Sequence, residues 1–277
     1  MSVKQERILF LLINYFNDTE VFEFITAQLN LQQTISYDVI VVNNGSSNTI
    51  TLTNLNCGNN SVQMITPPEN LGYLNGAQFG FDFYCKSNPV PDFTILCNTD
   101  IVIEDNRFLE KLTHEASNKN AEVIGPKIIS TLTFHDQNPM YKARLNIKKI
   151  KQLLFIYSYY PVYILYQLGA YLKRITKKLT YKNGKQTSGF VYAVHGSFLI
   201  FAKSFFEKGN TLRFPSFLYA EELFIAEQCL KSNSKIYYDS DLKIFHKEHS
   251  TSGFFKNRKH IQWLKQSLNY IYHTYYK

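Results

Sequence analysis

Three residues, Asn98-Thr99-Asp100, carry the first chemistry that can be read from this sequence. They follow an uncharged run at 93–97, which predicts a buried strand, and they precede a second apolar run at 101–103. An amide and a carboxylate two residues apart at a strand end point to the same side, so both face one ligand. Mg²⁺ and Mn²⁺ take oxygen ligands. The protein usually supplies one or two carboxylates, and phosphate oxygens and water fill the remaining positions. The triplet therefore predicts a divalent cation that holds a diphosphate, with a simple polar turn as the alternative.

Two neighbouring carboxylates, Glu221 and Glu222, stand at the start of a helix predicted at 223–231. The helix dipole favours negative charge at this end, so charge complementarity alone is one explanation and a catalytic role is the other. His246 ends an apolar strand predicted at 243–245, and a neutral imidazole at a strand end is able to bind a metal ion.

Two further histidines, His195 and His249, are candidates for contact with an acceptor. His195 lies in the segment 190–201, which predicts a strand interrupted at Gly196. A structural role is the alternative for His195. For His246 and His249 the alternative is a pair of loop residues that cap the sheet.

A scaffold must bring these distant strand ends together. Continuous apolar runs at 7–13, 39–42 and 62–65 are typical of strands covered on both faces. A helix from Asn17 or Asp18 to Leu29, with an apolar stripe that includes Phe22, separates the first two strands. This order is a βαβ unit, which places its strands parallel and puts ligands beyond their carboxyl ends.

Polar loops with small residues follow four successive predicted strands. The loop at 67–76 contains two glycines that permit close backbone approach, and the helix predicted after it at 77–86 would present its amides to an anion. We therefore expect a ligand-binding edge. Its candidate residues are Asn14, Asn43, Asn44, Gly45, Asn70, Gly72, Asn75, Gly76 and Asn98.

The charge of the chain is concentrated in one region. The 277 residues carry a net charge of +8, but residues 137–206 contain 12 basic residues and no Asp or Glu. The remaining 18 basic residues are outnumbered by 22 acidic ones. The basic charge therefore belongs to this region and indicates that its partner is anionic.

The middle of the basic region is uncharged from residue 153 to 172, a length that would suffice to cross a bilayer. Pro161 and the many tyrosines favour a broken helix or helix pair instead of a crossing. Such a pair, with basic ends, suits an anionic membrane surface. Packing on its own domain or on a partner subunit, as in an oligomer, is the alternative.

The ends of the chain and its cysteines indicate a cytoplasmic protein. The first residues contain neither a long apolar core nor a small-residue cleavage site, and the four cysteines lack metal-ligand spacing. Residues 254–276 form an aromatic, basic helical pattern that predicts a packing helix, with contact to a membrane or a partner as the alternative.

Four motifs together resemble those of family-2 glycosyltransferases with a GT-A fold, and most closely the rhamnosyltransferase-like branch that builds bacterial surface polysaccharides. They span about residues 7–250, in the family's order and spacing. The motifs are Ile40-Val41-Val42-Asn43-Asn44-Gly45-Ser46-Ser47, Asn70-Leu71-Gly72-Tyr73, Leu96-Cys97-Asn98-Thr99-Asp100 and Phe217-Leu218-Tyr219-Ala220-Glu221-Glu222. Asn43 and Glu222 stand where the family usually has Asp.

The resemblance implies an α/β fold, with a mixed, mostly parallel Rossmann-like sheet flanked by helices. It implies a GT-A domain at 1–250 that includes a basic, aromatic helical insertion at 140–186, followed by a helical tail at 251–277. The activity implied is inverting transfer of a sugar from dTDP-rhamnose or a UDP-hexose to a glycan or lipid-linked acceptor.

Residue roles follow from the same resemblance. Glu222 would be the catalytic base and Glu221 would orient acceptor or base. Asp100 and His246 would bind Mg²⁺ or Mn²⁺, and Asn43 would contact the nucleobase. The protein would work in the cytoplasm, on or near the inner face of the cell membrane.

Two other classes remain open. A sugar-phosphate nucleotidyltransferase shares the α/β plan but needs a glycine-rich basic loop after its first strand, and residues 14–18 contain no such loop. A non-catalytic module that binds a membrane or a polyanion would use the basic region. The long uncharged stretch between two basic clusters indicates a membrane interface rather than a nucleic-acid groove, so no nucleic-acid partner is expected.

Overall fold

The computed structural model describes residues 6–32, 34–45, 60–178, 186–248 and 257–277. The strands are β1 (Ile8–Asn14), β2 (Tyr37–Asn43), β3 (Ser61–Ile65), β4 (Phe93–Cys97), β5 (Ile101–Val102), β6 (Val123–Ser130), β7 (Gly189–Val191), β8 (Phe198–Ala202) and β9 (Ile236–His246). The helices are α1 (Asp18–Glu23) with its continuations η1 (Phe24–Gln28) and η2 (Leu29–Leu31), α2 (Tyr73–Cys85), α3 (Phe108–Lys119), α4 (Ile147–Ser158), α5 (Tyr160–Lys178), α6 (Lys203–Glu207), α7 (Glu221–Lys231), α8 (Arg258–Ile271) and η4 (Tyr272–Tyr276).

The described strands form one mixed sheet in the order β3-β2-β1-β4-β8-β6-β9-β5, with β7 also pairing with β9. β1, β2, β3 and β4 are mutually parallel, so their carboxyl ends share one edge, as predicted. β8 joins this half to the rest by pairing antiparallel with both β4 and β6. The mixed α/β class predicted from the sequence is therefore confirmed.

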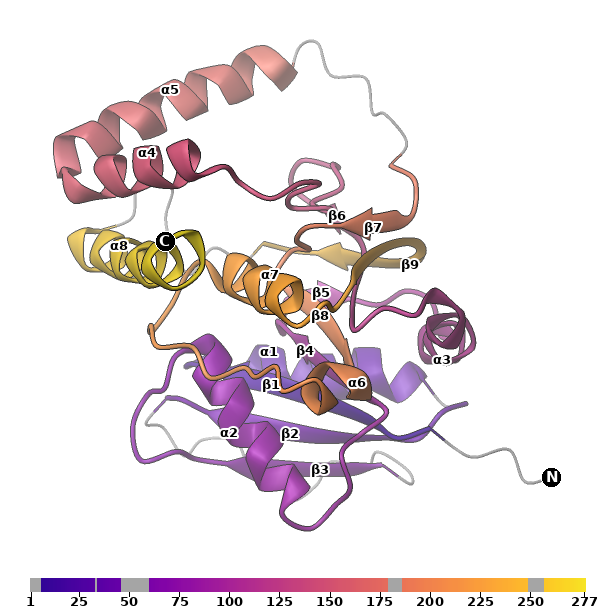
Figure 1. The fold of residues 1–277 in the computed structure, drawn as a ribbon. Coiled ribbons are helices and arrows are strands. Elements are labelled where there is room, and N and C mark those ends of the chain that lie inside the picture. Colours follow the sequence, from indigo (N-terminus) through magenta and orange to yellow (C-terminus); the bar gives the residue numbers. More distant parts are fainter. Residues whose placement is uncertain (1–5, 33, 46–59, 179–185, 249–256) are drawn as a thin grey trace.

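Helices cover both faces of the sheet (Figure 1). One face packs on α1, η1 and α3 through a core that includes Phe24, Phe108 and Phe198. The other face packs on α2, α4, α6, α7 and α8 through a second core that includes Phe81 and Phe224. Alternate residues of β1 enter opposite cores, which explains why its sequence is apolar throughout.

Two predicted boundaries and one predicted buried residue were wrong. α2 begins at Tyr73 and not at residue 77, because Gly72 adopts a left-handed φ of 78° and starts the helix at once. The strand predicted at 243–245 is the end of a longer strand, β9, which begins at Ile236 and shifts its register opposite Pro126 and Lys127. Phe22 is 47% exposed, since the stripe of α1 and η1 that faces the sheet consists of its neighbours instead.

The uncharged stretch at 153–172 is a helix pair, as predicted. α4 ends at Ser158, because the next residue, Tyr159, is extended with φ of −126° and ψ of 109°. α5 starts at once, with Pro161 in its first turn. Figure 1 shows α4 between α5 and α8, with α5 farthest from the sheet. No helix within the described ranges combines the length and the hydropathy needed to cross a membrane.

The C-terminal helix α8 is tied to the same region by a buried carboxylate. Arg144 donates to both oxygens of Glu227 on α7, at 2.9 and 2.8 Å, and to the carbonyl oxygen of Tyr275 at 2.7 Å. The hydroxyl of Tyr192 donates to the same carboxylate at 2.6 Å. Residues before α4, on α7 and after α8 therefore meet at Glu227.

We expect Arg144→Ala to lower the free energy of unfolding by about 2–3 kcal/mol, because a carboxylate with a side chain only 2% exposed would lose its cation. The loss is smaller than for a fully buried pair, since the Arg144 side chain is 40% exposed. The matched control is Arg213→Ala, which breaks the exposed pair with Asp82 and should cost less than about 1 kcal/mol. Urea unfolding measures both, and equal losses would contradict the structural role of Glu227.

Candidate active site

The loops after β1 and β2 are held together by their own asparagines. Asn14, only 1% exposed, donates to Asp18 at 2.5 Å and to the side-chain oxygen of Asn43 at 3.3 Å. That oxygen of Asn43 also accepts the Gly45 amide at 3.2 Å. These bonds fix the shape of the predicted nucleotide-binding edge, whereas contacts of the same residues with a nucleotide stay a prediction.

Gly72 is the point where this edge meets the loop that leads to α7. The Asn44 side chain donates to the Gly72 carbonyl oxygen at 2.8 Å, and the Gly72 amide donates to the Asn70 side chain at 2.9 Å. A Cβ atom at Gly72 would lie 2.0 Å from the Phe217 carbonyl oxygen. Together with its left-handed φ, this contact requires glycine at position 72.

Asn75 and Gly76 belong to the first turn of α2 and not to a loop. The Asn75 side chain donates to the Phe214 carbonyl oxygen at 2.8 Å and accepts the Phe214 amide at 2.9 Å. A Cβ at Gly76 would lie 3.1 Å from the Asn44 side chain. Both residues therefore hold neighbouring segments in place, and their predicted role in nucleotide binding stays a prediction.

Asp100 and His246 are brought together by the antiparallel pairing of β5 with the end of β9. Ile101 pairs with His246, and the Lys247 amide donates to the Asp100 carbonyl oxygen at 2.9 Å. The Asp100 Oδ2 and His246 Nε2 atoms lie 3.3 Å apart, and the two side chains are only 11% and 9% exposed. Neighbouring ligands of an octahedral Mg²⁺ ion are separated by a similar distance, about 3 Å.

Gln137 determines which nitrogen of His246 carries its hydrogen. The Gln137 amide nitrogen donates to Glu248 at 3.0 Å, so its oxygen is the atom that lies 2.8 Å from His246 Nδ1. Nδ1 is thus the donor, and in the neutral ring Nε2 presents a lone pair to the Asp100 carboxylate. Two acceptors at this distance need a cation between them, either a proton or a metal ion. The pair therefore fits a divalent ion.

No three His, Cys, Asp or Glu side chains among the described residues converge closely enough to hold a metal ion without help. Asp100 and His246 would supply two ligands. The remaining positions of an octahedral shell would fall to ligand oxygens and water, as is usual for Mg²⁺.

Glu222 lies against the backbone of Gly196. The Gly196 amide donates to Glu222 Oε1 at 3.1 Å. Glu221 accepts the Tyr219 amide at 2.6 Å instead, so the two carboxylates have different partners. Tyr219 and Ala220 precede them with φ of 74° and 63°, a left-handed pair that is rare outside glycine and is common at functional sites.

Two other side chains share this space. Burial, with the nearby Cys97 and several carboxylates adding to it, raises the pKa of Tyr73 well above its usual value, so its hydroxyl remains a hydrogen-bond donor. Burial lowers the pKa of His195, because it disfavours the charged ring. The nearby Glu222 acts in the opposite direction and raises the pKa, whereas His246 lowers it further. The rings of His195 and His246 meet edge to face with centroids 5.9 Å apart.

The structure thus forms two groups from the predicted residues. One comprises the residues around Asn14, Asn43 and Gly72, and the other comprises Asp100, His246, His195 and Glu222. The Asn98 amide donates to the Ser197 carbonyl oxygen at 2.9 Å, which places Asn98 beside the second group. His249 and the Ser46-Ser47 end of one motif lie outside the described residues.

Sequence reasoning assigned no role to Tyr73, Gly196 or Gln137. Tyr73 is part of a quoted motif, and Gly196 interrupts a predicted strand, so a signal existed for both. Nothing local distinguishes Gln137, whose position depends on the distant pairing of β6 with β9.

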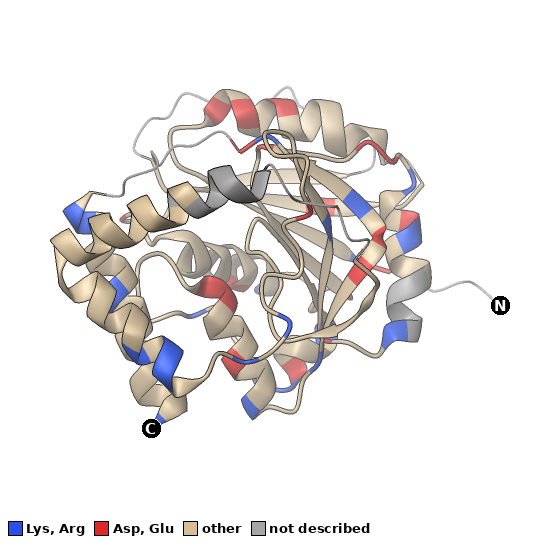
Figure 2. Ribbon diagram, turned by 90° about the horizontal axis from the view of Figure 1, so that it is seen from above, with Lys and Arg blue, Asp and Glu red and all other residues tan. Residues whose placement is uncertain are grey.

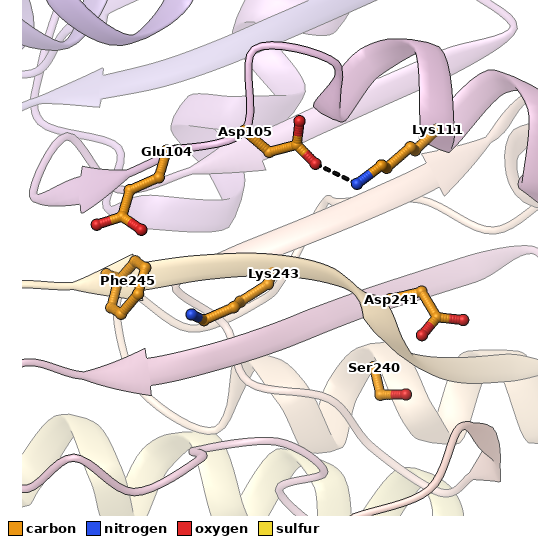
Figure 3. A pocket seen from close by; sticks show the side chains of 7 residues that line it. All are labelled: Glu104, Asp105, Lys111, Ser240, Asp241, Lys243 and Phe245. Atoms are coloured by element: carbon orange, nitrogen blue, oxygen red, sulfur yellow. Dashed lines mark hydrogen bonds and ion pairs between the residues drawn. The ribbon is translucent and has the colours of Figure 1, made fainter.

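A pocket of about 530 Å³ lies beside β9, and its lining includes Phe245, the neighbour of His246 in the chain. Figure 3 shows its lining, in which Asp105 and Lys111 form an ion pair. It contains none of the predicted site residues. The lining residues are Glu104, Asp105, Lys111, Ser240, Asp241, Lys243 and Phe245.

Comparison with protein-family models and with curated proteins gave no match to this sequence. Solved structures do match. A mannosyltransferase from Pyrobaculum calidifontis, described in complex with GDP-Man and Mn²⁺, aligns with a TM-score of 0.53 and 10% identity over 90% of this chain and 59% of its own. GalNAc-T7, described with UDP, GalNAc and Mn²⁺, aligns with a TM-score of 0.52 and 8% identity over 87% of this chain and 43% of its own.

A third structure, TarS from S. aureus, aligns with a TM-score of 0.53 and 13% identity over 87% of this chain and 36% of its own. This chain therefore spans less than two thirds of the length of each of the three proteins. At such low identities the similarity concerns the fold alone. The fold of the chain is the GT-A glycosyltransferase fold that the motifs implied.

Proposed function

We propose that this chain is a metal-dependent inverting glycosyltransferase, which moves a sugar from a nucleoside diphosphate to a hydroxyl group. The observation that carries the proposal is the pair formed by the Asp100 carboxylate and the His246 imidazole, whose Oδ2 and Nε2 atoms lie 3.3 Å apart at the end of β5. The pair lies near the Glu222 carboxylate, which accepts a hydrogen bond from the Gly196 amide. The GT-A fold supports the same conclusion.

In the proposed reaction the acceptor hydroxyl oxygen attacks the anomeric carbon while the bond from that carbon to the diphosphate oxygen breaks. Glu222 takes the hydroxyl proton as general base, and the electron pair of the broken bond leaves with the diphosphate. Glu221, which accepts the Tyr219 amide, orients the turn that carries the base.

Asp100 and His246 would hold Mg²⁺ or Mn²⁺, and Gln137 would keep His246 Nε2 free of hydrogen for it. When bound, the ion would neutralise the charge that develops on the leaving diphosphate. Two of the similar structures are described with Mn²⁺, which supports this cofactor without distinguishing it from Mg²⁺.

We propose dTDP-rhamnose or a UDP-hexose as donor, as in the rhamnosyltransferase-like branch, with Asn43 at the nucleobase. The proposed acceptor is a glycan or lipid-linked glycan in capsule, O-antigen or cell-wall polysaccharide synthesis. Binding to a panel of UDP, dTDP and GDP, measured by calorimetry with and without Mn²⁺, tests the class. A nucleotidyltransferase would prefer a nucleoside triphosphate, and a non-catalytic module would bind none of the three.

Asp100→Ala should remove the Mn²⁺-dependent part of nucleotide binding, because the ion loses its carboxylate. Gln137→Leu keeps both ligands but frees the imidazole, so metal affinity should fall by about 10- to 100-fold. Asp241→Ala, in the pocket beside β9, is the matched control and should bind as the unaltered protein does. Full Mn²⁺-dependent affinity in a folded Asp100→Ala variant would disprove the metal site.

Glu222→Gln is nearly isosteric but cannot accept a proton. Turnover should therefore fall by about 10²-fold or more while donor affinity is kept. Release of the nucleoside diphosphate measures turnover, and calorimetry measures affinity. If Glu221→Gln loses turnover and Glu222→Gln does not, the base has been assigned to the wrong carboxylate.

We propose further that the helix pair α4–α5 rests on an anionic membrane surface, where a lipid-linked acceptor would be found. α5 has no charged residue from Tyr160 to Leu172, and Figure 2 shows this part of its ribbon without Lys, Arg, Asp or Glu. Leu165 and Leu172 are 69% and 62% exposed. Anionic headgroups complement the 12 basic residues and the lack of acids at 137–206.

Binding to anionic vesicles should weaken with salt without vanishing, because headgroup attraction is screened and burial of apolar surface is not. A variant with four basic residues replaced by Gln should bind anionic vesicles more weakly, by at most about 1 kcal/mol for each charge removed. It replaces Lys173, Arg174, Lys177 and Lys178.

A charge-matched control removes four basic residues outside the segment and should bind vesicles normally. It replaces Lys86, Lys127, Lys231 and Lys235 by Gln. Co-sedimentation across a salt series compares the three proteins. Equal partitioning of all three at low salt would disprove the membrane proposal and leave α5 as a packed insertion or an oligomer contact.

A further inference from the structure

Three hydrogen bonds hold the segment 195–197, in addition to the one that its Gly196 amide donates to Glu222. The His195 amide donates to the Asn138 side chain at 2.7 Å. The Ser197 carbonyl oxygen accepts the Asn98 amide at 2.9 Å, which continues the pairing of β4 with β8. The Tyr73 hydroxyl donates to the Gly196 carbonyl oxygen at 3.1 Å. The Gly196 amide is therefore presented to Glu222 from a fixed frame.

Gly196 is a glycine because of Glu222 and not because of its own backbone. Among the described glycines, positive φ occurs at Gly72 and Gly209 but not at Gly196. A Cβ built on Gly196 would lie 2.8 Å from Glu222 Oε1 and 3.3 Å from its Cδ. Any larger residue at this position would push the carboxylate away from the amide that it accepts.

We infer that Tyr73 and Gly196 are positioning residues for Glu222. Tyr73 holds the Gly196 peptide from one side, and the Gly196 amide holds the carboxylate from the other. This inference rests on the proposed role of Glu222 as general base. Neither residue touches donor or acceptor in it, so both act on turnover and not on nucleotide affinity.

The arrangement explains how a glutamate serves at a position where the similar motifs carry an aspartate. A glutamate side chain is longer by one methylene and has one more rotatable bond, so its carboxylate needs an additional contact to stay in one place. The missing side chain at Gly196 provides the space, and its amide provides the contact.

The first test is a double-mutant cycle on turnover. Hydrolysis of UDP-glucose and of dTDP-rhamnose, with water as acceptor, supplies the readout without a known acceptor. Gly196→Ala should lower turnover by about 100-fold, the effect of a misplacement of about 1 Å, with the nucleotide dissociation constant unchanged. Glu222→Asp withdraws the carboxylate by one methylene, so in the Gly196→Ala background it should restore turnover, whereas alone it should lower it.

Tyr73→Phe should lower turnover by roughly three- to tenfold, since one neutral hydrogen bond is lost, again without change in nucleotide affinity. Tyr84→Phe is its matched control on the same helix. It removes a hydroxyl that donates to Asp38 at 2.6 Å, at the opposite end of α2 from Tyr73. Its turnover should be that of the unaltered protein. Equal turnover of Tyr73→Phe and Tyr84→Phe would overturn the role of Tyr73.

A second cycle uses urea unfolding and does not depend on activity. Gly196→Ala should shift the unfolding midpoint less in a Glu222→Ala background, because the crowded carboxylate is absent there. Additive shifts would overturn the contact between Gly196 and Glu222. Coupled shifts in a protein that neither binds nucleotides nor hydrolyses either donor would overturn the proposed function itself. Coupled shifts with additive effects on turnover would overturn the positioning role alone.

Discussion

The contact between Gly72 and the Phe217 carbonyl oxygen is the constraint on which the arrangement of the site depends. Only a residue without a side chain fits there, because a Cβ would lie 2.0 Å from that oxygen. The contact joins the loop after β3 to the segment that ends at Glu221 and Glu222. It also sets the first turn of α2, from which Tyr73 reaches Gly196 and Asn75 reaches Phe214. One close backbone contact therefore aligns the residues around Asn43 and Gly72 with the segment that carries Glu221 and Glu222.

The fold explains why the site draws on such distant parts of the chain. The parallel strands β1 to β4 supply one edge of polar loops, and β8 and β9 reach the same region from the far half of the sheet. Because β4 pairs with β8, and β5 with β9, Asp100 meets residues that lie about a hundred positions later in the sequence. The grouping of Asp100, His246, His195 and Glu222 thus depends on two antiparallel pairings added to a parallel sheet.

Local patterns sufficed for the strands and for the helix pair, since apolar runs and Pro161 act over a few residues. Motifs and strand ends also gave Asp100, His246 and Glu222 as candidates, and the structure brings these three residues into one region, while their roles stay predictions. Local patterns did not reveal that Asn44 and Asn75 bind neighbouring backbone, since an asparagine in a loop serves a ligand or a turn equally well. Gln137 could not be found either, because its role follows from tertiary contact with His246. The start of α2 was missed because the left-handed φ of Gly72 leaves no trace in a hydrophobic pattern.

Within the described residues, the edge of β9 that faces away from β6 is only partly paired, and its pattern explains how this edge avoids pairing with other chains. β6 pairs with β9 on one side, while the other side is shared by β7 near residue 236 and by β5 near residue 246. Between these two short partners the strand shifts its register and carries Asp241 and Lys243. A foreign strand would meet charge and an irregular backbone there instead of a continuous row of amides and carbonyls. This border of the sheet is thereby unsuited to recruiting other chains, even though interior strands such as β1 are strongly apolar.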